Sequence, residues 1–314
     1  MDSAGHVPVL DFSKLRGTSP ERSAAVQDIG TVCQKKGFFQ VINHGISMDI
    51  LDGALDAAVA FFDLPMDERS GLMSDDVTQP VRYSTVAEVD GSEVKIRRHV
   101  LKHYSYPLEE WIGKWPAKPS QYRQKMATYA AAVRPLVSEI MEAITESLGL
   151  GEDNLRTQMD RGLEMMALNC YPSSDDGVTG FPAHTDYTLV TVLLANGDGL
   201  EEFDREAGSW RAVPHSAGSL VVHVGNYLEV VSNGRYRAAM HRVASGRGGT
   251  RVSIASLPSL AMDEKVQVPK ELVGERRPAM YRESSLREFI EFLSAGGKSN
   301  DFMKSLKVNG TEQQ

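Results

Sequence analysis

The sequence is poor in cysteine and has no long apolar run. Its two cysteines, Cys33 and Cys170, are too few for a disulfide framework and too far apart for a zinc ribbon, so we expect a reducing compartment. No window approaches the roughly 18 consecutive apolar residues of a membrane-spanning helix, which excludes an integral membrane protein. The first residues also lack the basic and apolar regions of a secretory signal. We therefore expect a cytoplasmic protein.

Positive charge is also in deficit. The 34 Lys and Arg residues are outnumbered by 42 Asp and Glu, which gives a formal net charge of −8. Such a chain repels a phosphate backbone, so nucleic acid is not an expected partner. The 314 residues, 41% of them hydrophobic, are enough to bury a large core without disulfides. We expect a globular monomer whose partner is a small molecule.

Hydrophobic periodicity divides the first half of the chain. Apolar residues recur every three or four positions in three stretches, which predicts helices at 19–34, 50–62 and 119–149. An apolar, β-branched run at 38–42 predicts a strand. Residues 67–91 show no sustained period, so we expect a long loop or lid there.

The second half of the chain changes to short β-type runs. They are separated by Gly, Pro and Asn, and lie at 164–171, 189–194, 200–203, 220–224 and 251–257. Many short strands are typical of a barrel or jelly roll. Apolar residues at 286–293 then predict a closing helix.

The motif His184-Thr185-Asp186 indicates a metal site. In a strand, residues two apart point to the same face, so the imidazole and the carboxylate reach one ion. Two histidines and one carboxylate on one face of an octahedron leave three open positions, the arrangement of non-haem Fe(II) oxygenases. His215, His223 and His241 are the downstream candidates for the third ligand.

His241 is favoured as the third ligand because Arg251 and Ser253 follow it by about ten residues, again two apart on a strand-like run. The arginine provides a bidentate fork for a carboxylate, and the hydroxyl adds a donor to the same anion. We call Arg251 and Ser253 the carboxylate clamp, and they suit a dicarboxylate ligand.

The order H-x-D, then H, then R-x-S resembles the plant-type 2-oxoglutarate- and Fe(II)-dependent dioxygenases. The resemblance covers about residues 7–300. Three further stretches are similar to the family's motifs: Gly37–Gly45, Asn169–Pro172, and Ser232–Tyr236 with His241–Val243.

The resemblance implies the fold, the ligands and the cofactors. The fold would be α+β, a double-stranded β-helix (a cupin-like jelly roll) flanked by helices, one of them long. His184, Asp186 and His241 would bind Fe(II), and the clamp would bind the distal carboxylate of 2-oxoglutarate, with help from the two residues of the N-x-Y motif. These two are Asn169 and Tyr171. O2 would be the second co-substrate and ascorbate the reductant.

The expected organisation has four parts. Residues 1–118 would form an N-terminal helical and mixed cap, and 119–160 a long supporting helix. Residues 161–262 would form the jelly-roll core, followed by a C-terminal helix and tail at 263–314.

Sequence around residues 82–123 is most similar to the branch that holds flavone synthase type I and salicylate hydroxylases. This similarity implies oxidation of a small phenolic, most simply a flavanone to a flavone, with an aromatic acid such as salicylate as the alternative. Val100, Lys102 and Leu257 would line the substrate face, with Tyr187 near the mouth. The Lys102 ammonium would pair with an ionised phenol or carboxylate, or its stem would cover a ring while the charge reaches water.

Three alternatives to this interpretation are open. The same barrel could act as a non-catalytic receptor for an acidic small molecule, or as a zinc hydrolase with the same ligands. His99 and His103, four residues apart, could form a metal pair on a helix face. No neighbouring third ligand supports that pair, so we expect it to be solvated or to line a pocket.

Overall fold

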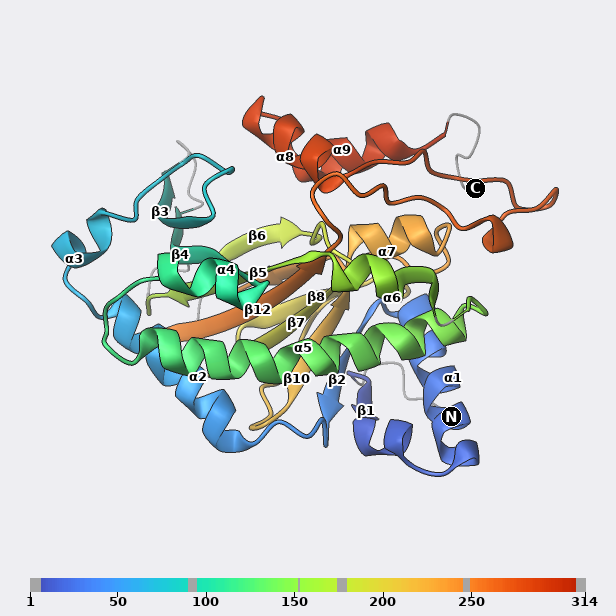
Figure 1. Cartoon of the computed structure of the whole chain (residues 1–314), viewed down its shortest axis with the longest axis horizontal. Coiled ribbons are helices and arrows are strands. Elements are labelled where there is room, and N and C mark those ends of the chain that lie inside the picture. The colour runs from blue at the N-terminus through green and yellow to red at the C-terminus, as the bar shows by residue number, and fades with distance from the viewer. Residues whose placement is uncertain (1–6, 90–94, 152, 174–179, 245–248, 309–314) are drawn as a thin grey trace.

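The computed structural model describes residues 7–89, 95–151, 153–173, 180–244 and 249–308. Two β-sheets face each other within it (Figure 1). In spatial order, the large sheet contains β1 (Val9–Asp11), β2 (Phe38–Ile42), β10 (Leu220–Val224), β7 (Val190–Ala195), β12 (Arg251–Ser259), β5 (Leu163–Tyr171), β4 (Lys95–Tyr106) and β3 (Val81–Val89). The small sheet contains β6 (Phe181–His184), β11 (His241–Val243), β8 (Leu200–Asp204) and β9 (Ser209–Ala212).

Strand pairing is antiparallel throughout the described sheets except between β1 and β2. Two facing antiparallel sheets of this kind form a jelly roll. The predicted α+β jelly-roll fold is therefore confirmed, and the predicted strands of the second half correspond to β5, β7, β8, β10 and β12.

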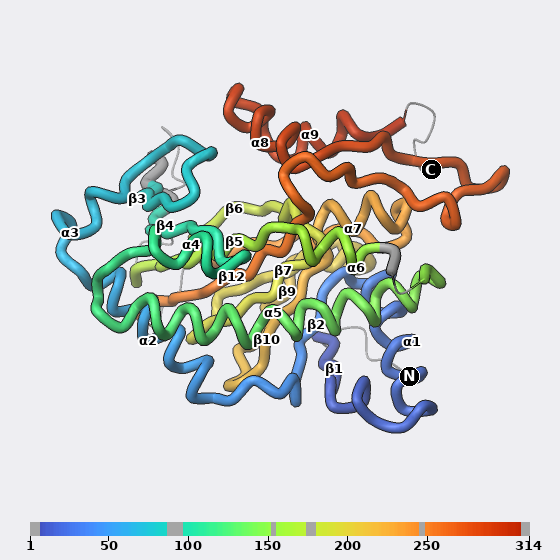
Figure 2. Tube along the Cα trace, in the orientation of Figure 1, coloured from blue at the N-terminus to red at the C-terminus, as the bar shows by residue number. Residues whose placement is uncertain are grey.

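Helices cover the outer face of the large sheet and one end of the barrel (Figure 2). They are α1 (Ser19–Lys35), α2 (Met48–Phe62), α3 (Met66–Ser70), α4 (Leu108–Trp111), α5 (Tyr122–Ser147), α6 (Asp153–Asp160), α7 (Asn226–Val231), α8 (Leu286–Ser294) and α9 (Ser299–Leu306), with 3-10 turns at Phe12–Arg16, Ile112–Lys114 and Lys270–Leu272. The predicted helices are confirmed as α1, α2, α5 and α8. None of the described helices has the length and apolar character needed to cross a bilayer.

The long helix α5 packs against the large sheet through its apolar stripe. Met126, Tyr129, Val133, Val137 and Ile140 are all fully buried along it. Their spacing of three and four residues places them on one side of the helix. This packing supports the strands whose opposite face lines the interior of the barrel.

The strand register gathers polar residues on the interior face of the large sheet. Ser253 on β12 lies opposite Asn169 on β5, and Arg251 lies opposite Tyr171. Residues two apart on a strand share a face, so the clamp and the N-x-Y residues point to the same side. The two motifs, about 80 residues apart in sequence, therefore meet across a single pair of strands.

The N-terminal region differs most from expectation. Part of the predicted loop or lid at 67–91 forms α3 and β3, and β4 was not predicted; the last residues of that loop lie outside the described part. Instead of only a cap, residues 7–118 contribute four strands to the large sheet. The signal was hidden because Arg82 and Lys102 interrupt the apolar alternation by facing the interior, while Tyr83 and Leu101 are buried on the other side.

Candidate active site

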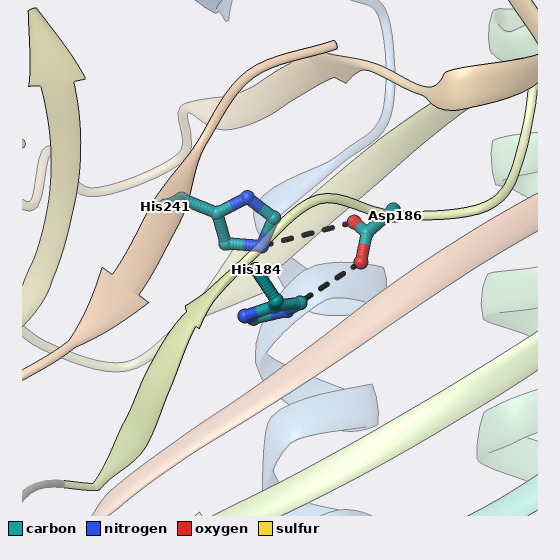
Figure 3. A group of neighbouring side chains, drawn as sticks. All are labelled: His184, Asp186 and His241. Carbon is teal, nitrogen blue, oxygen red and sulfur yellow. Dashed lines mark ion pairs between the residues drawn. The ribbon is translucent and has the colours of Figure 1, made fainter. Parts of the chain in front are cut away.

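Three side chains converge where the small sheet approaches the large one (Figure 3). His184 ends β6, His241 begins β11, and the two residues pair across the small sheet. Nε2 of His184 lies 3.6 Å from Oδ1 of Asp186, and Nε2 of His241 lies 3.8 Å from Oδ2. All three ligand atoms fall within 4.8 Å of one another. The structure thus brings together the three residues that the sequence predicted as metal ligands.

The position of Asp186 corrects one step of the prediction. The strand ends at His184, so Asp186 lies in the connection to β7 and not on the same strand face. Thr191 on β7 donates a 2.6 Å hydrogen bond to Oδ2 of Asp186. The Asn226 backbone N–H donates to the Asp186 carbonyl at 2.8 Å. These two bonds, rather than strand alternation, orient the carboxylate.

Backbone carbonyls determine which nitrogen each histidine offers. Nδ1 of His184 lies 2.9 Å from the Pro182 carbonyl, and Nδ1 of His241 lies 3.1 Å from the Ala239 carbonyl. A carbonyl only accepts, so each Nδ1 holds the proton and each Nε2 presents its lone pair. Both lone pairs are therefore available to a metal ion near Asp186.

The local electrostatics favour the protonation states that a divalent ion requires. Burial and the neighbouring His241 lower the pKa of His184 well below its ordinary value. Burial acts to raise the pKa of Asp186, but the nearby imidazoles and the Thr191 hydroxyl outweigh it, so the pKa is lowered. Neutral imidazoles and an ionised carboxylate are the ligand forms that bind metals. This donor set, two imidazoles and one carboxylate at the edge of the cavity, fits Fe(II).

A second group of possible ligands lies behind the first. Glu202, His223 and His241 also have ligand atoms within 4.8 Å of one another. His223 and Glu202 are 1% exposed and form a 2.5 Å ion pair, and the His223 ring stacks on His241 at 4.4 Å. The Glu202 carboxylate and the His223 imidazole already neutralise each other, so this pair needs no metal ion as a partner. His223, one of the downstream candidates for the third ligand, thus lies against the predicted iron ligand His241.

The carboxylate clamp lies on the interior face of β12. Arg251 and Ser253 are 4% and 2% exposed. The Arg251 guanidinium lies over the Tyr171 ring at 5.4 Å, its Nε donates to the Gly197 carbonyl at 3.3 Å, and its Nη1 has no hydrogen-bond partner among the described residues. A buried, unsatisfied guanidinium nitrogen is costly unless an acceptor binds to it. The clamp therefore fits the distal carboxylate of 2-oxoglutarate.

One cavity of about 290 Å³ joins the metal ligands to the clamp. Of the residues predicted to line the substrate face, Lys102, Tyr187 and Leu257 border this cavity, as do Asn169 and Tyr171. Val100 is 4% exposed and lies outside the lining described for the cavity. Its short side chain lies between the longer Arg98 and Lys102 on the same face of β4, and substrate contact through Val100 stays a prediction.

Helix α8 forms part of the cavity wall. Leu286, Phe289, Ile290 and Leu293 border the cavity, although none of them is fully buried. Tyr187, next to the metal ligands, stacks on Phe289 at 3.7 Å, and its hydroxyl lies 3.2 Å from Ser284 Oγ. The apolar face of α8 is therefore directed at the cavity and is anchored through Tyr187.

Sequence reasoning did not identify Arg98 as a site residue. Its guanidinium lies 3.6 Å above the Phe181 ring, its Nη1 donates a long 3.4 Å bond to Asn169, and its Nε is buried without a partner in the described part of the chain. The four-residue spacing from Lys102 in a strand would have placed both on one face. This shared face would have identified Arg98 only if a strand had been predicted at Lys95–Tyr106.

The pair His99 and His103 is not a metal site. Both lie on strand β4 and not on a helix. His103 Nε2 lies 2.8 Å from the Tyr122 hydroxyl, and His99 Nδ1 lies 3.0 Å from the Tyr83 hydroxyl. Neither residue borders the cavity that contains the predicted ligands.

Two family descriptions match the chain. Residues 7–123 match the N-terminal region described as "non-haem dioxygenase in morphine synthesis N-terminal". Residues 163–257 match the 2OG-Fe(II) oxygenase superfamily. The second match contains both ligand segments and the clamp.

Similar proteins agree with these matches. Flavanone 3-dioxygenase 3 of Oryza sativa subsp. japonica is 42% identical over 307 residues, covering 96% of this chain and 93% of that protein. The same plant's 2-oxoglutarate-dependent dioxygenase 21, chloroplastic, is 41% identical over 96% of this chain and 91% of its own length. The crystal structure of JOX2 in complex with 2OG, Fe and JA has the same fold, with a TM-score of 0.85 at 23% identity over 96% of this chain and 89% of that one. The chain belongs to the plant 2-oxoglutarate- and Fe(II)-dependent dioxygenases, enzymes that use Fe(II) and 2-oxoglutarate.

Proposed function

We propose that this dioxygenase oxidises a small phenolic plant metabolite, and that the reaction is the desaturation of a flavanone to a flavone. The observation that supports a phenolic ring system as the substrate is the cavity beside the predicted iron ligands, whose apolar lining includes Met165, Leu257 and Phe289. Such a lining suits a flat ring system. The similarity to a flavanone 3-dioxygenase agrees with a flavanone as the ring system.

In this proposal His184, Asp186 and His241 bind Fe(II) through the two Nε2 atoms and the carboxylate. Arg251 and Ser253 bind the distal carboxylate of 2-oxoglutarate. Bound Fe(II) and 2-oxoglutarate supply, with O2, the oxidant that removes hydrogen from the organic substrate.

The protein's own contribution is orientation and exclusion of water. Tyr171 packs under the Arg251 guanidinium, and Asn169 lies opposite Ser253, so both limit where the co-substrate can lie. Helix α8 shields the cavity from bulk water through its apolar face. The substrate carbon nearest the iron ligands then decides between hydroxylation and desaturation.

Turnover of 2-oxoglutarate to succinate with a panel of flavanones and aromatic acids tests the proposal. A flavone product, identified by mass spectrometry, is the expected result; a hydroxylated flavanone would refute desaturation. Hydroxylation of an aromatic acid such as salicylate is the second candidate, favoured by Lys102 in the cavity wall. Ligand binding without succinate formation would indicate a receptor, and activity without O2 and 2-oxoglutarate would indicate a zinc hydrolase.

We also propose a cytoplasmic monomer that uses ascorbate as its reductant. Light scattering on the purified protein tests the monomer, and cell fractionation tests the location. Recovery in chloroplasts, as the name of one relative states for that protein, would contradict the cytoplasmic assignment. Loss of sustained turnover when ascorbate is omitted is the expected result for the reductant.

A further inference from the structure

The cavity wall is more positively charged than the iron site and its co-substrate require. Among the described residues that border the cavity, Asp186 provides the one carboxylate, whereas the cations are Arg82, Arg98, Lys102 and Arg251. Fe(II) and 2-oxoglutarate have equal and opposite charges, so their binding leaves this excess in place. The excess is local, because the whole chain has a net charge of −8. A further anion is therefore expected to be attracted to this cavity.

The cations lie at two levels along the strands. Arg251 lies opposite Tyr171, and Arg98 reaches toward Asn169, so both belong to the end of the cavity that fits 2-oxoglutarate. Lys102 follows Arg98 by four residues on β4, which corresponds to about 13 Å along an extended strand. At that level Lys102 pairs with Arg82 on the neighbouring strand β3. Lys102 and Arg82 thus form a separate pair, away from the carboxylate clamp.

Few acceptors neutralise this pair. Arg82 donates one 2.8 Å hydrogen bond to the Gln79 carbonyl. Lys102 is partly buried, and the carboxylate that attracts it is Asp186. Burial, with the repulsion of Arg82 and Arg98, lowers the pKa of Lys102 to about 8, although the attraction of Asp186 opposes the shift.

The surface next to the pair is flat and apolar. Lys102 lies opposite Ala167, which lies opposite Ala255 on β12, and both alanines border the cavity. The next inward-facing positions are Met165 and Leu257, which also pair. Small side chains followed by apolar ones leave room for a ring directly beside the two cations. The arrangement is suited to a ring that bears a negatively charged oxygen.

We propose that Lys102 and Arg82 form an anion subsite for an ionised oxygen of the organic substrate, either the phenolate of a flavanone or the carboxylate of an aromatic acid. The proposal rests on the proposed function, since it names the chemical group by which that substrate is bound. The ring lies over Ala167 and Ala255, and the oxygen contacts Lys102. The iron ligands then face the opposite end of the substrate.

The test is anaerobic binding to the Fe(II)- and 2-oxoglutarate-loaded enzyme, measured by calorimetry. The three probes are a 7-hydroxyflavanone, its 7-methoxy derivative and 2-hydroxybenzoate. Wild type, Lys102→Met, Lys102→Arg and Arg82→Met are compared, with Lys125→Met on the outer helix α5 as the matched control. We expect Lys102→Met to weaken binding of the ionisable probes by about ten- to hundredfold, the effect of one charged hydrogen bond. The methoxy compound should be unaffected, and Lys102→Arg should restore binding.

The outcomes separate the subsite from the function. Stronger binding of 2-hydroxybenzoate than of the hydroxyflavanone identifies a carboxylate as the anion, and the reverse identifies a phenolate. Equal loss for methoxy and hydroxy probes, no charge-dependent binding by wild type, or a higher KM for 2-oxoglutarate in Lys102→Met would overturn the subsite. If the anions bind through Lys102 but no flavanone is oxidised, the subsite stands and the flavanone assignment falls. If flavanones are oxidised equally well by Lys102→Met, the flavanone assignment stands and the subsite is overturned.

Discussion

Replacing Arg251 by Lys separates recognition of 2-oxoglutarate from recognition of the organic substrate. Arg251 is 4% exposed, its Nε donates to the Gly197 carbonyl, and its Nη1 lacks a partner among the described residues. Lysine retains the charge but loses the bidentate fork and the bond to Gly197. Losing one charged hydrogen bond costs about 1.5–3 kcal/mol, which corresponds to a rise of about 10- to 150-fold in the KM for 2-oxoglutarate.

The assay is succinate formation at varied 2-oxoglutarate with a saturating flavanone, followed by varied flavanone with saturating 2-oxoglutarate. The KM for the flavanone should change by much less, because the clamp lies away from the apolar wall. Ser253→Ala should act in the same direction with a smaller effect, since a neutral hydrogen bond is worth about 0.5–1.5 kcal/mol. Arg22→Lys, in a surface ion pair with Glu146, is the control for the substitution itself. Equal increases in both KM values would show that Arg251 supports the fold and does not bind the co-substrate.

Three further tests concern the metal site, a buried titratable group and the cavity wall formed by α8. His241→Ala should abolish turnover and Fe(II) binding with little change in the melting temperature, whereas the exposed His215→Ala should retain both; near-normal turnover in the first variant would remove His241 as a ligand. Burial raises the pKa of Glu164 to about 7 from an ordinary value of 4.5, although Arg134 opposes the shift. The folded state therefore binds more protons than the unfolded state in this window, so the free energy of unfolding falls as the pH rises from 4.5 to 7. Urea unfolding across that range should show a smaller fall for Glu164→Gln, and an unchanged slope would contradict the assignment. Phe289→Ala removes the stack on Tyr187 and should raise the KM for the flavanone several-fold while leaving the KM for 2-oxoglutarate unchanged; a change confined to 2-oxoglutarate would contradict a substrate-facing role for α8.

The local sequence was sufficient for much of the fold and for the proposed ligands. The helices α1, α2, α5 and α8 have apolar residues at helical spacing, and β5 and β12 are short, mostly apolar runs that follow or precede glycine-containing stretches, so the local pattern located them. His184, Asp186 and His241 were recognised because residue type and order limit the metal chemistry. The clamp followed from two residues on one strand face, and the strand register agrees with that placement.

The tertiary structure decided features that depend on contacts between distant segments. Strands β3 and β4 were missed because their interior face contains charged residues, and only pairing with β5 reveals that this face borders a cavity. The orientation of Asp186 depends on Thr191 and Asn226 and not on strand alternation. The Glu202–His223 pair joins two sheets, and α8 reaches the cavity through Tyr187. In each case the determining interaction joins residues that are far apart in the sequence, and their spacing along the chain does not determine the distance between them in the folded protein.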